Sequence, residues 1–171
     1  LGSVSSQIIQ KQYKEADPVL KQSFLTLLAR VPNRSNFQFL TNLVLVEPRE
    51  LLIHMTNECL FASKSYPDKD KKVFEALIRE HIRIAEKHKN ERALVSYAIL
   101  LGGLGLKSSL SILMRYTESK YAVELRRHAL ISVAKIAQAG KIDESFQKSL
   151  LTLLAEADFP NIVQNVLAIM E

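Results

Sequence analysis

The segment Ala93-Leu94-Val95-Ser96-Tyr97-Ala98 returns as Ala129-Leu130-Ile131-Ser132-Val133-Ala134, so that position 93 recurs at position 129, 36 residues later. Each copy continues into a glycine-containing break, at 102–105 and at Gly140, and another apolar helical run follows. A fainter third copy places Phe61-Ala62 at the position of Tyr97-Ala98. Tandem helical hairpins at a fixed period are typical of α-solenoids, such as HEAT-like α-α superhelices. The sequence therefore predicts antiparallel helical hairpins stacked side by side.

The composition is that of a folded helical chain. Of the 171 residues, 47% are hydrophobic and 24% are charged, as in ordinary globular domains. There are only 5 Gly and 5 Pro, each of which can be placed between helices, and the alternating pattern of strands is nearly absent. We therefore predict an all-α fold in one domain over 1–171, with better-defined repeats in 92–171 and less regular ones in 3–90.

Capping signals and apolar periodicity predict about nine or ten helices. They are expected near 3–16, 18–31, 36–46, 48–65, 72–89, 92–101, 109–116, 123–138, 144–157 and 161–171. The run 36–46 is apolar nearly all round, so we expect a helix packed between neighbours, although a strand would also suit it. In 72–89 we expect Ile84 to be packed and Glu75 to lie in solvent. The helix from Asp17-Pro18 is expected to bury Val19, Leu20, Phe24, Leu27, Leu28 and Val31.

Charge and cysteine content narrow the possible partners. The formal net charge of +5 favours acidic partners only weakly, and the basic residues are scattered among acids, which is unlike a nucleic-acid-binding stripe. The single cysteine, Cys59, excludes an internal disulfide.

No apolar run reaches the roughly 18 residues of a membrane span, and no signal peptide is visible. The segment 161–171 has an apolar face without a polar capping helix after it, so we expect a fragment of a longer protein.

None of the potential reactive groups forms a recognisable catalytic or metal-binding motif. His81 and His88 share a helix face but are about two turns apart, too far for one ion, so we expect solvated surface histidines and no metal. His54 and Cys59 fall on different sides of one helix, so we expect a buried structural cysteine rather than a nucleophile with its base. We expect no catalytic residue and no cofactor.

Two further features could be functional or structural. The glycines of 102–105 superficially resemble a phosphate-binding loop, but a helix precedes them, so we expect them to let two helices of a hairpin approach and turn. The densest basic spots contain Lys71 and Lys72, and Arg126 and Arg127. Such runs are usually solvated helix starts, and a partner-binding patch that includes these four residues is the alternative hypothesis.

The segment from Leu100 to Glu171 resembles the helical domain of the large lipid transfer proteins. This family comprises vitellogenins, the large subunit of microsomal triglyceride transfer protein, apolipophorins and the amino-terminal part of apolipoprotein B. The resemblance lies in four stretches: Leu101 to Leu110 with its Leu-Gly-x-x-Gly turn, Leu113 to Glu118, Val123 to Leu130 with Arg-x-x-Ala-Leu, and Val166 to Met170. Generic HEAT repeats share the turn and the Arg-x-x-Ala-Leu helix.

The resemblance implies a non-catalytic scaffold for lipid transport or lipoprotein assembly. Such a segment is expected to brace lipid-binding domains and to contact partner subunits or neighbouring domains of the same chain, with lipid held elsewhere in the parent protein. This implies the secretory pathway, either the endoplasmic reticulum lumen or the extracellular space. The alternative is an intracellular, cytoplasmic HEAT-like adaptor that binds a protein or peptide on its concave face. A helical-repeat enzyme or nucleic-acid binder is a third, weaker hypothesis.

Overall fold

All regular structure in the described part of the chain is helical, which confirms the all-α prediction. The computed structural model describes residues 3–138 and Lys148. Within these residues there are eight α-helices, one short 3-10 helix and no strand, so the strand alternative for 36–46 is wrong. The helices predicted at 144–157 and 161–171 lie outside the described residues. The elements are α1 (Ser3–Tyr13), α2 (Pro18–Ala29), α3 (Arg34–Val46), α4 (Arg49–Ser63), α5 (Asp68–Lys87), α6 (Glu91–Leu104), η1 (Lys107–Ser109), α7 (Leu110–Arg115) and α8 (Val123–Gln138).

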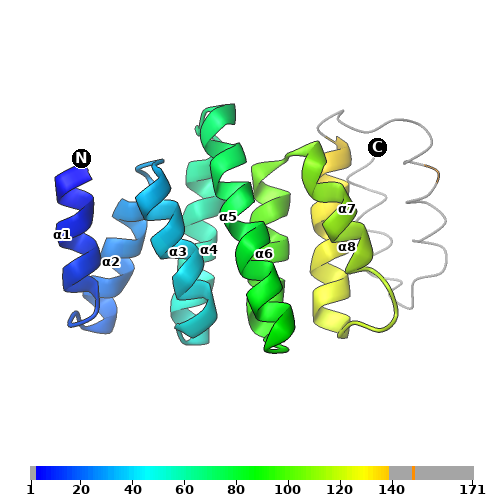
Figure 1. Ribbon diagram of the computed structural model, residues 1–171, viewed down its shortest axis with the longest axis horizontal. Coiled ribbons are helices and arrows are strands. Elements are labelled where there is room, and N and C mark those ends of the chain that lie inside the picture. Colours follow the sequence, from blue (N-terminus) through cyan, green and yellow to red (C-terminus); the bar gives the residue numbers. More distant parts are fainter. Residues whose placement is uncertain (1–2, 139–147, 149–171) are drawn as a thin grey trace.

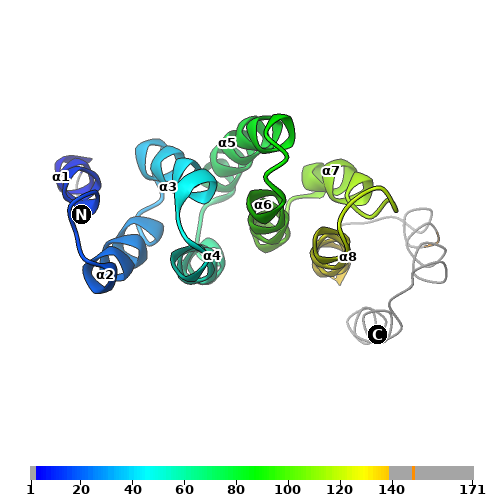
Figure 2. The same cartoon turned by 90° about the horizontal axis from the view of Figure 1, so that it is seen from below.

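The described helices stand side by side in two rows, and successive helices run in opposite directions (Figure 1). One row contains α1, α3, α5 and α7, and the other contains α2, α4, α6 and α8 (Figure 2). The array bends, so that α2, α4, α6 and α8 lie on its concave side (Figure 2). We call this the inner row and the other the outer row. Because the inner-row helices all run in the same direction, their amino-terminal ends lie along the same edge of the array (Figure 1).

The start of α2 follows the predicted capping chemistry, whereas the predicted serine cap at 108 or 109 is not formed. The Asp17 carboxylate accepts a hydrogen bond from the backbone N–H of Leu20 at 2.8 Å, and Pro18 occupies the first position of α2. The start predicted for the helix at 72–89 is wrong, because the corresponding helix, α5, begins at Asp68, directly after Pro67. Asp68 and Asp70 in the first turn of α5 interact favourably with the positive end of the helix dipole.

The glycines of α6 allow close helix packing. A Cβ atom on Gly102 would come within 2.8 Å of the Ser132 Cα atom in α8, and one on Gly103 would overlap the end of the Leu60 side chain in α4. Only Gly105, with φ of 64°, ends the helix in the left-handed region. The expected turn is therefore confirmed, whereas the expected approach between the two helices of one hairpin is wrong. The break expected at Gly102 is wrong, since α6 continues to Leu104, and the helices that approach are α4 and α8 of the same row.

The 36-residue repeat occupies equivalent places in two packed helices. The first copy lies in α6 and the second in α8, which pack against each other. The alanines at 93, 98, 129 and 134 are all 0% exposed, and the Ser132 hydroxyl donates to the Ala98 carbonyl at 2.9 Å. The third copy fails at one position: Phe61 is 65% exposed, whereas Tyr97 is fully buried and donates to the Thr41 carbonyl of α3 at 2.9 Å. Small residues therefore define the seam between α6 and α8.

Several predicted burial patterns are wrong in detail. On α2, Leu25, Leu28 and Ala29 are buried, but Val19, Leu20 and Leu27 remain exposed, because α2 is the first described helix of the inner row and has an inner-row neighbour, α4, on one side only. On α5, Ile84 is exposed and Glu75 is buried, the reverse of the prediction. In the run 36–46 the apolar side chains are buried or half-buried as predicted, except that Val46 is exposed, and the polar residues Gln38 and Asn42 are also exposed.

Glu75 is buried because polar groups of η1 surround its carboxylate. The Ser108 and Ser109 hydroxyls donate to it at 2.8 and 2.7 Å, and the Arg79 guanidinium donates at 3.0 Å. Further along α5, Glu86 accepts hydrogen bonds from Arg115 and from the Tyr116 hydroxyl. These two clusters join α5 to the segment from η1 to α7, so the outer row is held partly by charge-assisted hydrogen bonds.

We predict that Gly102→Ala lowers the free energy of unfolding, whereas Gly103→Ala leaves it nearly unchanged. Alanine adds about 1 kcal/mol of helix propensity at either position. At 102 the added methyl group meets the backbone of α8, and such overpacking costs about 1–3 kcal/mol. At 103 it meets the flexible end of Leu60, which can turn aside. Urea unfolding of the two variants measures the difference, and equal stabilities would contradict the close-approach role of Gly102.

Candidate functional site

The principal hollow among the described residues is a groove on the concave face, across the inner row. It has a volume of about 580 Å³ and is lined by 49–57 of α4, 91–99 of α6 and 122–128 at the start of α8. Figure 2 shows α6 set back from α4 and α8, toward the outer row, so α6 forms the floor and its two neighbours form the walls. Below, "the groove" means the hollow lined by these three segments.

The three helices come into close contact toward their carboxyl-terminal ends. These contacts involve Leu60 of α4, Gly102 and Gly103 of α6, and Ser132 of α8. The residues that line the groove lie nearer the amino-terminal ends of the same helices, at 49–57, 91–99 and 122–128. The close contacts and the groove therefore lie at different levels along the three helices.

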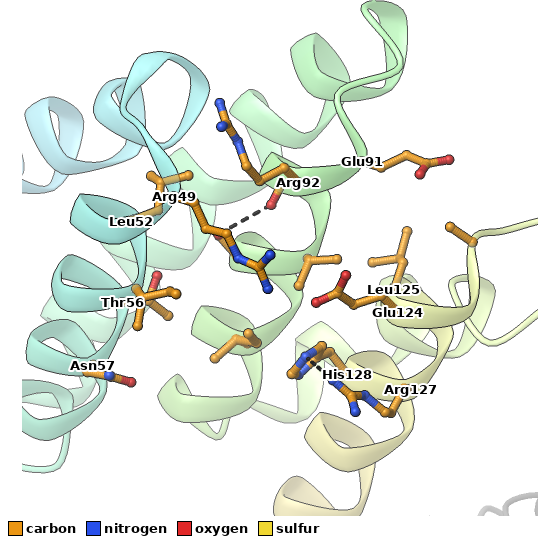
Figure 3. A pocket seen from close by; sticks show the side chains of 15 residues that line it. Arg49, Leu52, Thr56, Asn57, Glu91, Arg92, Glu124, Leu125, Arg127 and His128 are labelled. Atoms are coloured by element: carbon orange, nitrogen blue, oxygen red, sulfur yellow. Dashed lines mark hydrogen bonds between the residues drawn. The ribbon is translucent and has the colours of Figure 1, made fainter. Parts of the chain in front are cut away.

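The groove combines an apolar floor with charged walls. Val95 and Ile99 of α6 are half-buried on the floor, and Ile53 of α4 is 53% exposed. Figure 3 shows Arg49 of α4 reaching toward the middle of the groove and Glu124 of α8 reaching in from the other side. Such a surface can bind a ligand with both apolar and charged groups.

Three arginines at the groove have no carboxylate partner. Within the part of the chain that the structure describes, Arg49, Arg92 and Arg127 form no ion pair, although Glu91 and Glu124 line the same groove. The Arg127 guanidinium only approaches the imidazole Nε2 of its neighbour His128, at 3.4 Å (Figure 3). These guanidinium groups are therefore available to an anionic group from outside.

The His128 imidazole is held toward its neutral form. Burial lowers its pKa below the usual 6.5, and the positive charge of Arg127 lowers it further. A neutral imidazole can accept the hydrogen bond that Arg127 directs toward it.

One polar group in the groove wall lacks an internal partner. The Thr56 hydroxyl of α4 is buried, and it has no hydrogen-bond partner among the described residues. Threonine hydroxyls inside helices commonly donate to a carbonyl one turn earlier, as Thr41 does to the Phe37 carbonyl at 2.9 Å. A buried hydroxyl without such a bond costs free energy unless water or a ligand satisfies it.

The four basic residues of the predicted patch do not share one surface. Arg127 lies at the groove, but the Arg126 guanidinium is half-buried and donates to the Thr117 carbonyl at 3.2 Å. Lys71 and Lys72 lie in the first half of α5, which belongs to the outer row. The start of α5 and the start of α8 lie at opposite edges of the array (Figure 1). Among the four, Arg127 alone lines the groove.

The histidines and the cysteine have structural environments. His81 is 3% exposed, so the prediction that it is a solvated surface residue is wrong. Its two ring nitrogens contact the Leu77 carbonyl at 2.8 Å and the Asn42 amide oxygen at 2.6 Å. Cys59 is buried as predicted, and burial, aided by Glu58, raises its pKa to about 12. Among the described residues, no three His, Cys, Asp or Glu side chains form a group that could hold a metal ion.

Sequence reasoning missed Arg49, Arg92 and Thr56. The repeat did indicate part of the site. Glu91 and Arg92 directly precede its first copy, and Arg127 and His128 directly precede its second copy. All four residues line the groove. Nothing comparable marked Arg49 or Thr56, since their roles depend on how α4 packs against α6.

A smaller hollow lies in the outer row between α1 and α3, around Gln10 and Arg34.

Comparison with known proteins adds no relative. No protein-family model matches the chain, and searches of curated proteins and of solved structures return no match. None of the described helices is long and apolar enough to cross a membrane.

We predict that His128 makes the fold less stable as the pH falls below about 6.5. The unfolded chain, with the ordinary imidazole pKa, binds the proton more readily than the folded chain, so acid favours unfolding between the ordinary and the lowered pKa. Unfolding by urea at pH 7.5 and at pH 5.5 measures this loss. His128→Gln should reduce it, because the variant lacks this imidazole. An identical pH dependence in the variant would contradict the prediction.

Proposed function

We propose that the chain is a non-catalytic scaffold, an α-solenoid of antiparallel, HEAT-like helical hairpins, that acts by contacting a protein through its concave face. The groove across the inner row supports this proposal most directly. It joins an apolar floor to three arginines that form no ion pair with a described residue, and it lies open on the concave side of a two-row helical array. Repeat scaffolds with concave faces of this kind bind extended partners.

The resemblance to the large lipid transfer proteins supports one setting for this scaffold, in lipid transport or lipoprotein assembly. The residues that carry the resemblance have packing roles in this chain. Gly102 permits the approach of α8, Gly105 ends α6, and Arg126 ties α8 to the Thr117 carbonyl. These roles fit a segment that braces neighbouring lipid-binding domains and contacts partner subunits, while lipid is held elsewhere. The setting implies the secretory pathway.

The second setting is an intracellular adaptor that binds a protein or peptide partner in the same place. The specific observation that favours it is the groove itself, since a segment that only braces its neighbours does not require exposed, unpaired guanidinium groups on its concave face. Both settings use contact rather than chemistry, and they differ in where the partner comes from.

Lipid analysis of the natural protein distinguishes the two settings. The lipid transport setting predicts that the protein purified from its source under native conditions carries triglyceride or phospholipid, which extraction and mass spectrometry detect. The 171-residue chain, purified in the same way, serves as the control and is expected to carry none. Natural protein that is free of lipid would contradict this setting and leave the adaptor.

Photo-cross-linking tests the contact function in either setting. A photoreactive phenylalanine analogue at Ile53, in the groove, should give a cross-linked protein adduct or an intramolecular link to another domain in the natural protein. The same analogue at Ile84, which is exposed on the outer row, is the matched control and should give far less. Mass spectrometry identifies the linked peptide. Equal or absent cross-linking at the two positions would contradict the concave face as the contact surface.

A further inference from the structure

We propose that the groove binds a short acidic peptide segment, whose carboxylates contact Arg49, Arg92 and Arg127 while an apolar side chain packs on its floor. This inference rests on the proposed contact function and adds the chemistry of the partner. Three features of the groove support it: its charges, an unpaired hydroxyl in its wall and its dimensions.

The charges of the groove match carboxylates better than any other common peptide group. The three arginines come from three different helices, and among the described residues no carboxylate lies within ion-pair distance of them, although Glu124 faces Arg49 across the groove (Figure 3). By contrast, Arg79 and Arg115 in the outer-row contacts each pair with a glutamate, at Glu75 and Glu86. Guanidinium groups bind carboxylates through two parallel hydrogen bonds. The amino-terminal ends of three inner-row helices, which carry partial positive charge, surround the same space.

The Thr56 hydroxyl supplies a second and independent observation. It lies in the groove wall, is 5% exposed as a residue, and has no hydrogen-bond partner among the described residues. Because its oxygen atom is itself buried, a backbone carbonyl or carboxylate of a peptide in the groove can accept its proton only after the Thr56 side chain turns about χ1. Such a bond removes the free-energy cost of the unsatisfied group and adds to binding.

The size of the groove sets the length of the segment. Neighbouring helix axes lie about 8–10 Å apart, so three helices span roughly 20 Å. An extended peptide covers this distance with about six residues at ~3.3 Å each. Because Glu124 also reaches into the groove, a uniformly acidic peptide is disfavoured. We therefore expect two or three carboxylates spaced around one apolar anchor that packs on Val95 and Ile99.

A random library of 12-residue peptides, selected on the immobilised 171-residue chain, tests the inference. Enriched peptides should contain Asp or Glu around a Leu, Ile or Val. Fluorescence anisotropy then compares two triple variants of equal net charge. Reversal at the groove (Arg49→Glu, Arg92→Glu, Arg127→Glu) should weaken binding at least roughly tenfold, whereas reversal on the outer row (Arg34→Glu, Lys72→Glu, Arg83→Glu) should change it less than about twofold.

Two further measurements separate a specific site from general attraction and from misfolding. The groove-reversed variant should bind peptides in which Lys replaces Asp and Glu, which only a folded groove can do. Thr56→Val should weaken binding of the acidic peptides without lowering the free energy of unfolding. Equal binding by the two triple variants, or the absence of enriched acidic peptides, would overturn the inference.

The same experiments distinguish a failure of this inference from a failure of the proposed function. If the enriched peptides are basic or apolar and Ile53→Asp abolishes their binding, the acidic partner is wrong but the groove remains a contact surface. If no binding depends on the groove and cross-linking at Ile53 also fails, both the inference and the proposed function are wrong.

Discussion

The close approach of α6 to both neighbours in the inner row is the constraint on which the rest of the described structure depends. At Gly102 the backbones of α6 and α8 come so near that no side chain fits between them, and the Ser132 hydroxyl fills the remaining space by donating to the Ala98 carbonyl. Gly103 receives the Leu60 side chain of α4 in the same way. Dense packing at these points fixes the separation of three helices, because interiors tolerate little change in volume.

The two rows are held by different interactions. In the inner row α6 and α8 meet through glycine, alanine and serine, which are small enough for these two helices to pack backbone against backbone. In the outer row α5 is joined to the segment from η1 to α7 by hydrogen bonds that Ser108, Ser109, Arg115 and Tyr116 direct at two glutamates. Long polar side chains bridge a wider space than small ones. The outer row is therefore spaced more widely than the inner row along this part of the array.

The groove lies on the same three helices as these close contacts. The contacts join α4, α6 and α8 toward their carboxyl-terminal ends, and the hollow above the floor of α6 lies nearer their amino-terminal ends. Because the inner-row helices run in the same direction, the positive ends of α4, α6 and α8 lie around that hollow, and one arginine from near the start of each helix lines it. The close packing and the groove thus lie at different levels along the same three helices.

Local patterns determined much of the fold, and tertiary packing decided the site. Capping residues such as Asp17, apolar periodicity and the 36-residue repeat were enough to predict helices, their order and a buried Cys59, because these features depend on neighbours along the chain. The burial of Glu75 and of His81, and the exposure of Val19, could not be read in the same way. The burial of each of these residues depends on whether a side chain of another helix lies opposite it, and on which side chain that is. The groove depends on packing most of all, since Arg49, Arg92 and Arg127 are far apart in sequence and meet only where the inner row brings three helices together.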